Sequence, residues 1–344
     1  MRAAYLEAVG RVAIREVDEP RIEAATDAIV DIVATSICGS DLHIVLGHLG
    51  GEIGFTLGHE YVGVIREVGP AVREFAVGDR VVGPPAPWCG VCARCRRGDA
   101  AHCERGGVLG SGTAFGGFGG TQAERMRVPY ADRDLVRVPE QVGDASALGV
   151  ADAFMTGATG ARNAGAGPGR SLAVFCCGPI GLMAIHAAAA RGARRIIAVD
   201  PVAERRQLAL ALGASHETGD ADPRAFIAEA TGGRGVDGAV EAVGLPSTFA
   251  AALDALGPNG ELAVLGIGGE PFSFAAGPTL LKTVRMWIGL GDVTLQEGLM
   301  ALIADGLADP APLFDLEVGL DEVPALYERL QTPGHGITKA LIRP

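Results

Sequence analysis

The sequence predicts an α/β protein with two domains, one rich in β-strands and one built on a doubly wound parallel sheet. Its 344 residues exceed the usual size of a single domain. The first third carries short β-like runs that glycine and proline separate. After about residue 150, strand-like and helix-like runs alternate, which is typical of βαβ units and a parallel sheet.

The strand-like runs of the first third are rich in β-branched residues, which favour pleated, half-buried surfaces. No long amphipathic helix separates them, so we expect a compact all-β unit with several loops. The predicted strands cover residues 28–37, 61–69, 79–83 and 123–129.

The second half begins with SLAVFCCG, a buried-strand run, followed by the helical run PIGLMAIHAAAARGA. Further apolar strand-like runs follow, with one more helix between the first two of them. The predicted strands are 171–178, 195–200, 236–244 and 260–268, and the predicted helices are 179–193 and 202–214. The tail is expected to add helices at 295–306 and 320–330 and a final strand at 339–344.

Composition narrows the class of partner. With 41 acidic and 29 basic residues the formal net charge is -12, which argues against nucleic acids and anionic membranes as partners. The N-terminus lacks the apolar core and cleavage site of a signal peptide. No run reaches the ~18 apolar residues of a membrane span. We therefore expect a cytoplasmic protein that acts on a small molecule.

Four of the seven cysteines lie close together, in WCGVCARCRRGDAAHC. The odd number of cysteines and the absence of an export signal disfavour a disulfide framework and favour metal ligation. Four thiolates suit a closed, tetrahedral structural zinc site, and an iron–sulfur cluster is the alternative. The predicted ligands are Cys89, Cys92, Cys95 and Cys103.

Asp152 stands alone in the apolar run ALGVADAFMTG. A carboxylate in such surroundings is costly to bury unless something pairs with it. Two explanations are open from the residues alone: a bound cation, or an N-cap role at the start of a helix.

The run SLAVFCCGPIGLMA predicts a strand, a tight turn and the start of a helix, where dinucleotide folds place a pyrophosphate. Gly178 and Gly181 occupy the second and third positions of the G-x-G-x-x-G fingerprint, but Cys176 stands at the first. The next strand ends in Asp200, where an acid binds ribose hydroxyls and repels a 2′-phosphate. NAD is therefore favoured over NADP, although Arg205 and Arg206 could soften that preference.

Taken together, these motifs resemble the zinc-dependent medium-chain alcohol dehydrogenase family. The resemblance covers essentially the whole chain, through CGSDLH, LGHEYVGVI, VGDRV, the four-cysteine loop, CGPIGLMA and the closing KALIRP. It implies a GroES-like β-rich catalytic domain over 1–152 and 291–344, with the structural zinc loop at 89–103. It also implies a Rossmann domain over 153–290, with the active site in the cleft between the two domains.

By the same resemblance, Cys38, His59 and Asp152 hold a catalytic zinc with one coordination position open. Zinc there lowers the pKa of an alcohol, so that the alcohol loses its proton near neutral pH. Glu60 would lie beside the ion, and an ordinary salt bridge is its alternative role.

Two further residues of CGSDLH receive roles from the resemblance. Ser40 would accept the substrate proton, and His43 would relay it to solvent. A surface histidine without a catalytic role is the alternative for His43.

The resemblance also assigns cofactor contacts, although core packing remains the alternative for the apolar ones. The turn at 178–181 would hold the pyrophosphate, Thr156 would lie near the nicotinamide, and Lys339 would reach the pyrophosphate. The expected cofactor residues are Thr156, Gly178, Pro179, Ile180, Gly181, Asp200, Arg205, Val243, Leu265, Ile267 and Lys339. An apolar substrate pocket would be lined by Phe55, Trp88, Phe154 and Trp287.

The implied activity is that of a zinc-dependent NAD(H) alcohol dehydrogenase or carbonyl reductase with two zinc ions per chain. Hydride would pass between an alcohol, ketone or aldehyde at the zinc and the nicotinamide. Two branches of the family fit: one like formaldehyde dehydrogenase and dismutase, the other like secondary alcohol dehydrogenase. A redox-neutral aldehyde dismutase with tightly held NAD and a non-catalytic cofactor-binding protein are the alternatives. A homodimer or homotetramer is expected, paired through edge strands between residues 273 and 291.

Overall fold

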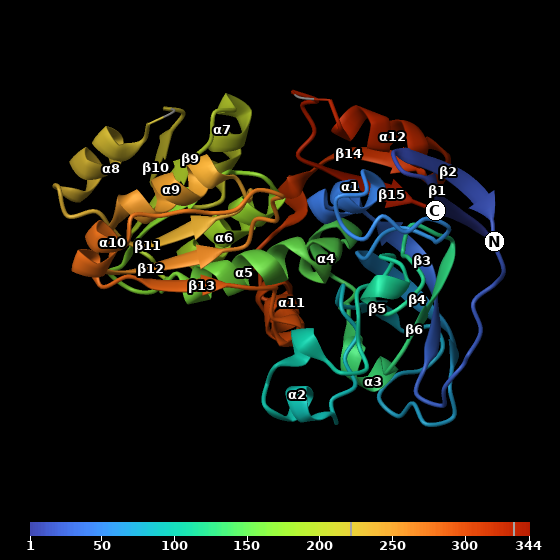
Figure 1. Ribbon diagram of the computed structural model, residues 1–344. Helices are drawn as coiled ribbons and strands as arrows, with labels where there is room; N and C mark the ends of the chain where they lie inside the picture. Colours follow the sequence, from blue (N-terminus) through green and yellow to red (C-terminus); the bar gives the residue numbers. More distant parts are fainter. Residues whose placement is uncertain (221, 333) are drawn as a thin grey trace. The chain divides into compact units, whose positions relative to one another are not determined.

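The computed structural model describes residues 1–220, 222–332 and 334–344 (Figure 1). The chain forms two compact units. Met1–Asp152 and Asp292–Pro344 make up the β-rich unit, and Ala153–Gly291 makes up the parallel-sheet unit. The second boundary lies one residue beyond the predicted 290.

The β-rich unit is built around a mixed sheet in the order β14-β15-β3-β4-β5-β7, with β6 paired to β3. Apolar side chains on the strands, among them Val30, Tyr61 and Met126, are buried in one core cluster. The strands are β3 (Ala28–Thr35), β4 (Tyr61–Val68), β5 (Arg80–Val82), β6 (Arg125–Val128), β7 (Val136–Arg137), β14 (Phe314–Gly319) and β15 (Lys339–Arg343).

An N-terminal hairpin also belongs to this unit and was missed by the sequence analysis. Its strands, β1 (Arg2–Ala8) and β2 (Arg11–Glu16), pair antiparallel. The turn between them contains Gly10 at φ 77, a left-handed conformation that glycine adopts without strain. Alternation of apolar and polar residues around a glycine was the signal for this hairpin.

The expectation of an all-β first unit needs correction, because short helices connect its strands. The α-helices are α1 (Gly39–Val45), α2 (Ala93–Arg96), α3 (Ala131–Asp134), α4 (Asp144–Ala151), α11 (Gln296–Ala304) and α12 (Val323–Leu330).

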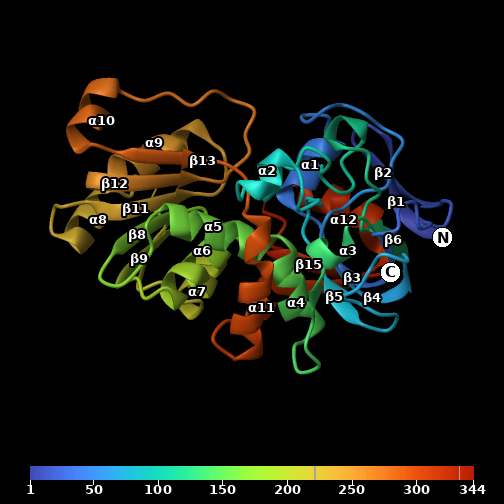
Figure 2. The same cartoon turned by 90° about the horizontal axis from the view of Figure 1, so that it is seen from below.

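The parallel-sheet unit has strand order β10-β9-β8-β11-β12-β13, and its strand pairs are parallel. From β8 the chain builds the sheet first in one direction, through β9 and β10, and then in the other, through β11, β12 and β13. This reversal creates a topological switch point between β8 and β11. The strands are β8 (Ser171–Phe175), β9 (Arg195–Val199), β10 (His216–Thr218), β11 (Val236–Glu241), β12 (Leu256–Val264) and β13 (Arg285–Ile288). Figure 2 shows β13 beside β12 at the edge of the sheet.

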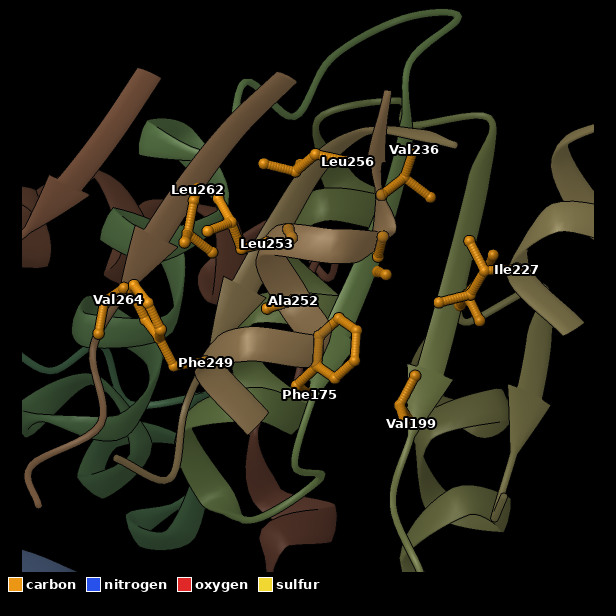
Figure 3. Close-up of a cluster of buried hydrophobic side chains, with 14 residues drawn as sticks. Phe175, Val199, Ile227, Val236, Phe249, Ala252, Leu253, Leu256, Leu262 and Val264 are labelled. Atoms are coloured by element: carbon orange, nitrogen blue, oxygen red, sulfur yellow. The ribbon is translucent and has the colours of Figure 1, made fainter. Parts of the chain in front are cut away.

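Helices cover this sheet because its central strands are apolar on both faces. Phe175, Phe249 and Leu262 belong to a buried cluster between the sheet and the helices (Figure 3). The helices are α5 (Ala153–Asn163), α6 (Pro179–Ala190), α7 (Ala203–Ala211), α8 (Arg224–Thr231), α9 (Pro246–Ala255) and α10 (Ala276–Lys282).

The structure corrects one expectation about the sheet edge. Residues 273–275 are not in a strand, and α10 follows them, so β13 alone provides the edge. No helix within residues 1–220, 222–332 and 334–344 combines the length and apolar character needed to cross a membrane.

Candidate active site

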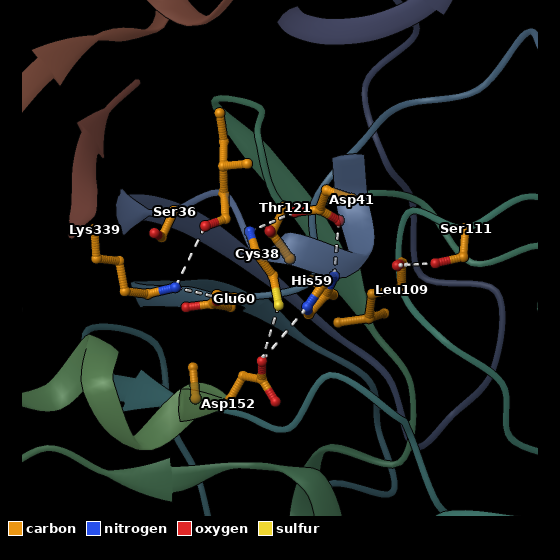
Figure 4. Close-up of polar contacts among 12 residues, drawn as sticks. Ser36, Cys38, Asp41, His59, Glu60, Leu109, Ser111, Thr121, Asp152 and Lys339 are labelled. Atoms are coloured by element: carbon orange, nitrogen blue, oxygen red, sulfur yellow. Dashed lines mark hydrogen bonds and ion pairs between the residues drawn. The ribbon is translucent and has the colours of Figure 1, made fainter. Parts of the chain in front are cut away.

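Cys38, His59 and Asp152 lie together in the β-rich unit, although they are far apart in the sequence (Figure 4). Cys38 is the N-cap of α1, shortly after β3. His59 comes just before β4, which pairs with β3. Asp152 follows α4, at its C-cap. Pairing of β3 with β4 therefore brings the first two side chains together.

The spacing of these side chains suits a metal ion. Cys38 Sγ lies 3.4 Å from Asp152 Oδ2, and His59 Nε2 lies 3.8 Å from the same oxygen. Tetrahedral zinc bonds of ordinary length put ligand atoms roughly 3.3–3.8 Å apart. The thiol and the imidazole thus lie close to the distances from the Asp152 carboxylate that a shared zinc ion would set.

Glu60 joins this group and is completely buried. Its Oε1 accepts a hydrogen bond from Lys339 Nζ at 2.8 Å, while its Oε2 is buried with no hydrogen-bond partner. A buried carboxylate oxygen without a partner is costly. Each of the four residues offers one atom within 4.8 Å of the others, so the Glu60 carboxylate lies beside the position that a cation would take.

Asp41 is a site residue that the sequence analysis missed. It is fully buried, and its Oδ2 accepts the backbone amide of Cys38 at 2.9 Å. Its Oδ1 lies 2.9 Å from His59 Nδ1, close enough for an ion pair although the atoms do not meet hydrogen-bond geometry. Asp41 thereby turns Nε2 of His59 toward Asp152, an arrangement typical of metal-binding histidines. The only sequence signal was an acid three residues after Cys38.

The protonation behaviour of the group fits a cation site. Burial, and then the charge of Asp152, raises the pKa of the Cys38 thiol. Burial likewise raises the pKa of Glu60, although Lys339 partly opposes it. Burial lowers the pKa of His59, but the carboxylates of Asp41 and Asp152 outweigh it and raise the pKa well above its ordinary value. Protons therefore accumulate here in the absence of a cation, and a divalent ion would replace them.

Lys339 is buried in the β-rich unit, where its ammonium contacts the Glu60 carboxylate and the carbonyl of Ile37. Burial lowers the pKa of Lys339, but the charge of Glu60 outweighs burial and raises it. Its role toward the pyrophosphate remains a prediction.

Ser40 and His43 lie on α1, three residues apart and hence on one face of the helix. His43 Nδ1 lies 3.2 Å from Nδ1 of His48, whose side chain is exposed. The imidazole of His43 is thus linked to a solvent-facing imidazole, an arrangement that can carry a proton outward.

The four-cysteine loop brings its thiols together in the same unit. Cys89, Cys92, Cys95 and Cys103 have sulfur atoms within 4.8 Å of one another. Cys92 Sγ lies 3.4 Å from Cys95 Sγ and 3.9 Å from Cys103 Sγ. All are free cysteines. His102 is exposed and binds Asp99 through Nδ1 at 2.5 Å, which directs it away from a ligand role.

Backbone amides point at these sulfurs. Cys89 N donates to Cys103 Sγ at 3.3 Å, and Cys95 N donates to Cys92 Sγ at 3.5 Å. The hydrogen bond from Cys95 N lowers the pKa of Cys92 to about 6, whereas burial raises the pKa of Cys95 to about 12. Amides that stabilise thiolates favour a cation bound to four sulfurs.

In the parallel-sheet unit, Gly178 is the N-cap of α6, and Pro179 and Ile180 begin the helix. A Cβ at Gly181 would lie 1.8 Å from the carbonyl oxygen of Cys176, so the turn requires glycine there. Cys176 has φ 78. The first fingerprint position therefore keeps the left-handed backbone that glycine normally supplies, even though cysteine occupies it.

Asp200 follows β9 and is almost completely buried. Its carboxylate accepts the amides of Cys177 at 2.7 Å and Val202 at 2.8 Å, which fixes the cofactor turn. Arg206 is held by Glu217 and by the carbonyl of Asp200. The structure shows no hydrogen bond or ion pair for the Arg205 side chain within its described residues.

Glu241, at the end of β11, is another residue that the sequence analysis missed. It is fully buried and accepts hydrogen bonds from Gly244 N at 2.8 Å and Thr248 Oγ1 at 2.7 Å. Its carbonyl oxygen accepts the amide of Leu265. Glu241 therefore joins the loops that carry Val243, Leu265 and Ile267. A polar residue inside an apolar strand run was its signal.

The exposure of the remaining predicted residues differs. Ile267 is 42% exposed, whereas Thr156 and Leu265 are buried in the same unit. Phe154 is completely buried with its ring against His186, so its expected place in a substrate pocket is wrong and it packs in the core.

Comparison with known proteins identifies both parts of the chain. Residues 24–140 match the family described as "Alcohol dehydrogenase GroES-like domain", and residues 179–304 match the family described as "Zinc-binding dehydrogenase". A probable zinc-binding alcohol dehydrogenase of Mycobacterium tuberculosis is 34% identical over 331 residues, which are 95% of this chain and 84% of that protein.

Solved structures of similar fold are also alcohol dehydrogenases or zinc-binding dehydrogenases. An alcohol dehydrogenase from Thermus sp. ATN1 has a TM-score of 0.94 and 36% identity, over 100% of this chain and 99% of that one. A putative zinc-binding dehydrogenase from Sinorhizobium meliloti 1021, bound to NADP, has a TM-score of 0.89 and 25% identity, over 100% and 99% of the two chains. The chain therefore belongs to the zinc-dependent medium-chain alcohol dehydrogenase family and is an oxidoreductase that acts on CH–OH groups.

Proposed function

We propose that this protein is an NAD(H)-dependent alcohol dehydrogenase or carbonyl reductase that holds two zinc ions. One ion would bind Cys38, His59 and Asp152, and the other would bind the four-cysteine loop. The observation that carries the proposal is the group around Asp152, with its ligand separations of 3.4 and 3.8 Å and the unsatisfied Oε2 of Glu60. One sulfur, one nitrogen and one oxygen ligand leave a coordination position for substrate.

The zinc would supply Lewis-acid chemistry, lowering the pKa of an alcohol or polarising a carbonyl. The protein's own residues would do the rest. Asp41 orients His59, and Lys339 holds Glu60 close to the ligands. Ser40 would accept the substrate proton, and His43 would pass it toward His48 and solvent.

NAD is the proposed cofactor, bound to the parallel-sheet unit at the turn 178–181. Asp200 puts a carboxylate at the end of β9, which would repel a 2′-phosphate. Arg206 is already held by Glu217, so Arg205 is the cation left to attract such a phosphate. The NADP-bound relative makes the choice a matter for measurement.

The edge of the parallel sheet supports a homo-oligomer. Within the described residues β13 pairs only with β12, and Ile288 on β13 is 62% exposed. Leu280 and Leu281, on the preceding helix α10, are 76 and 82% exposed. An exposed apolar sheet edge invites strand pairing with a second chain. We propose that two copies pair at β13.

The test combines metal analysis with kinetics. The purified protein should contain two zinc ions per chain, and Cys38→Ser and Cys103→Ser should each lose a different one. A panel of primary and secondary alcohols, aldehydes and ketones should show net NADH production or consumption, with NADP(H) weaker. Aldehyde dismutation without net NADH, or NAD that is released only on denaturation, would favour the dismutase. One zinc and no turnover would favour a non-catalytic protein.

A further inference from the structure

The parallel-sheet unit contains a cavity of about 550 Å³ at the edge where its strands begin. It is lined by the residues around the starts of β8, β9, β11 and β12, which are neighbours in the sheet. Figure 3 shows Val236 and Leu256 at this edge, while Phe175 and Val199 lie toward the opposite edge, from which the cofactor turn continues. The cavity is therefore separate from the proposed cofactor site.

Four arginines line the cavity: Arg170, Arg194, Arg195 and Arg234. Two of them have buried Nε atoms, those of Arg170 and Arg195, that lack a hydrogen-bond partner. Within the described residues, Arg194 and Arg234 make no side-chain hydrogen bond or ion pair. These two Nε atoms are enclosed by protein, and Arg170 Nη2 donates to the carbonyl of Asp237 at 3.3 Å. The unpaired guanidinium groups open to the cavity are therefore those of the exposed Arg194 and Arg234.

The acids nearby are already engaged. Asp237 also lines the cavity, and its Oδ2 accepts both the amide and the hydroxyl of Ser171 at 2.8 Å. Glu261 lies 3.6 Å from Arg170 but pairs more closely with Arg285. The lining therefore contains four arginines and one acidic residue, in a chain whose formal net charge is -12.

A purely structural explanation accounts for part of this arrangement. Helices α6 and α8 end at this side of the sheet, and helix C-termini attract cations. That attraction gives the guanidinium groups of Arg194 and Arg234 no hydrogen-bond acceptor, however, and it does not require a cavity.

We propose that this cavity binds a small anion that carries phosphate groups. Planar guanidinium groups form paired hydrogen bonds with phosphate oxygens, which would engage the unpaired guanidinium groups of Arg194 and Arg234. The volume falls within the range of small-molecule sites and exceeds the needs of a single phosphate ion. A pyrophosphate group or a phosphate ester is thus the matching class of ligand. The site is independent of the zinc chemistry.

Calorimetric titration of the full-length, zinc-loaded protein with inorganic pyrophosphate at constant ionic strength tests this site. The Arg194→Ser/Arg234→Ser variant should lose one binding component or bind at least tenfold more weakly. The matched control is Arg73→Ser/Arg329→Ser, which removes two exposed arginines of the β-rich unit and should bind like the wild type. Binding at the cofactor turn persists in all three proteins, so identical isotherms would overturn the proposal.

A residue-level measurement completes the test. Phenylglyoxal modification, mapped by mass spectrometry, should be slowed by pyrophosphate at Arg194 and Arg234, and unchanged rates at both would contradict the site. Circular dichroism checks folding, and Arg234→Gln replaces the double variant if that one is unfolded. A nucleoside monophosphate that binds more tightly than pyrophosphate would identify an organic phosphate as the ligand. Citrate binding in place of both phosphates would overturn the phosphate assignment.

Discussion

The two groups of candidate metal-binding side chains in the β-rich unit are built in opposite ways. The four cysteines come from one loop, residues 89–103, and local turns set their positions. Cys38, His59 and Asp152 come from three segments, and β3, β4 and α4 must fold before they meet. The first group resembles a closed structural site, and the second an open catalytic one.

Their surroundings differ as well. Backbone amides donate to the sulfurs of the loop, so the chain's own peptide groups stabilise negative charge there. The second group is crowded with carboxylates, and buried Lys339 and buried Asp41 hold its members in place. A local site can therefore tolerate changes elsewhere in the fold, whereas the assembled site depends on several distant partners.

The largest expected effect is that of Asp152→Asn, which removes an anionic ligand from the assembled site. Losing several kcal/mol of charge stabilisation should lower kcat/KM by about 10³-fold or more. Zinc content after dialysis should fall from two ions per chain to one. The control Asp18→Asn neutralises an exposed acid and should change neither value. If Asp152→Asn kept two zinc ions and normal turnover, Asp152 would not be a ligand, and the assembled group would not be the catalytic metal site.

Asp41→Asn should have the next largest effect, because it keeps the side-chain size and removes the charge that faces His59. Loss of such a partner typically weakens metal binding about 10- to 100-fold. The pH profile of kcat/KM should also move, since Asp41 raises the pKa of His59. Competition with a chelator measures the affinity. Asp99→Asn, within the four-cysteine loop, is the control and should leave the assembled site unchanged. Unchanged zinc affinity in Asp41→Asn would show that Asp41 does not position His59.

The sequence contained much of this architecture. The spacing of the cysteines pointed to one metal site, because a single loop sets the geometry. Alternating strand and helix runs predicted the parallel sheet, because burial on both faces leaves continuous apolar runs such as the one that ends at Phe175. The family resemblance added the roles of Cys38, His59 and Asp152.

The rest depended on contacts between distant segments. Asp41 and Glu241 are buried acids whose partners become visible only in three dimensions. Lys339 lies 279 residues from Glu60, so no spacing rule connects them. The arginines of the cavity come from separate strand ends and meet only because the sheet places those strands side by side.

The pH dependence of zinc binding separates the groups further. Burial raises the pKa of Cys38 and of Glu60 in the folded protein. Protonation of these two groups therefore stabilises the zinc-free fold at low pH. This contribution to stability is lost as the pH rises through their folded-state pKa values. Zinc must displace the proton of Cys38, whose pKa lies above the ordinary 9.0 of a thiol, so its affinity should rise with pH below that value, about tenfold per pH unit for each proton released. A chelator titration measures this slope, and the same titration on Asp152→Asn gives the slope of the loop alone. A flat profile after that correction would mean that zinc displaces no protons from the assembled site.

The smallest effect on catalysis is expected from Cys103→Ser, which removes one sulfur of the loop. The loop zinc should be lost, and the Tm of the β-rich unit should fall by about 5–10 °C, because each kcal/mol shifts Tm by roughly 2–4 °C in a unit of this size. Well below that temperature, kcat/KM per folded protein should stay close to wild type, since the loop contributes no ligand to the assembled site. Calorimetry and kinetics measure the two quantities. His102→Ala changes the neighbouring residue, which is bonded to Asp99, and should keep both zinc ions. A loss of turnover in Cys103→Ser as large as that in Asp152→Asn would show that the local and assembled groups act as one.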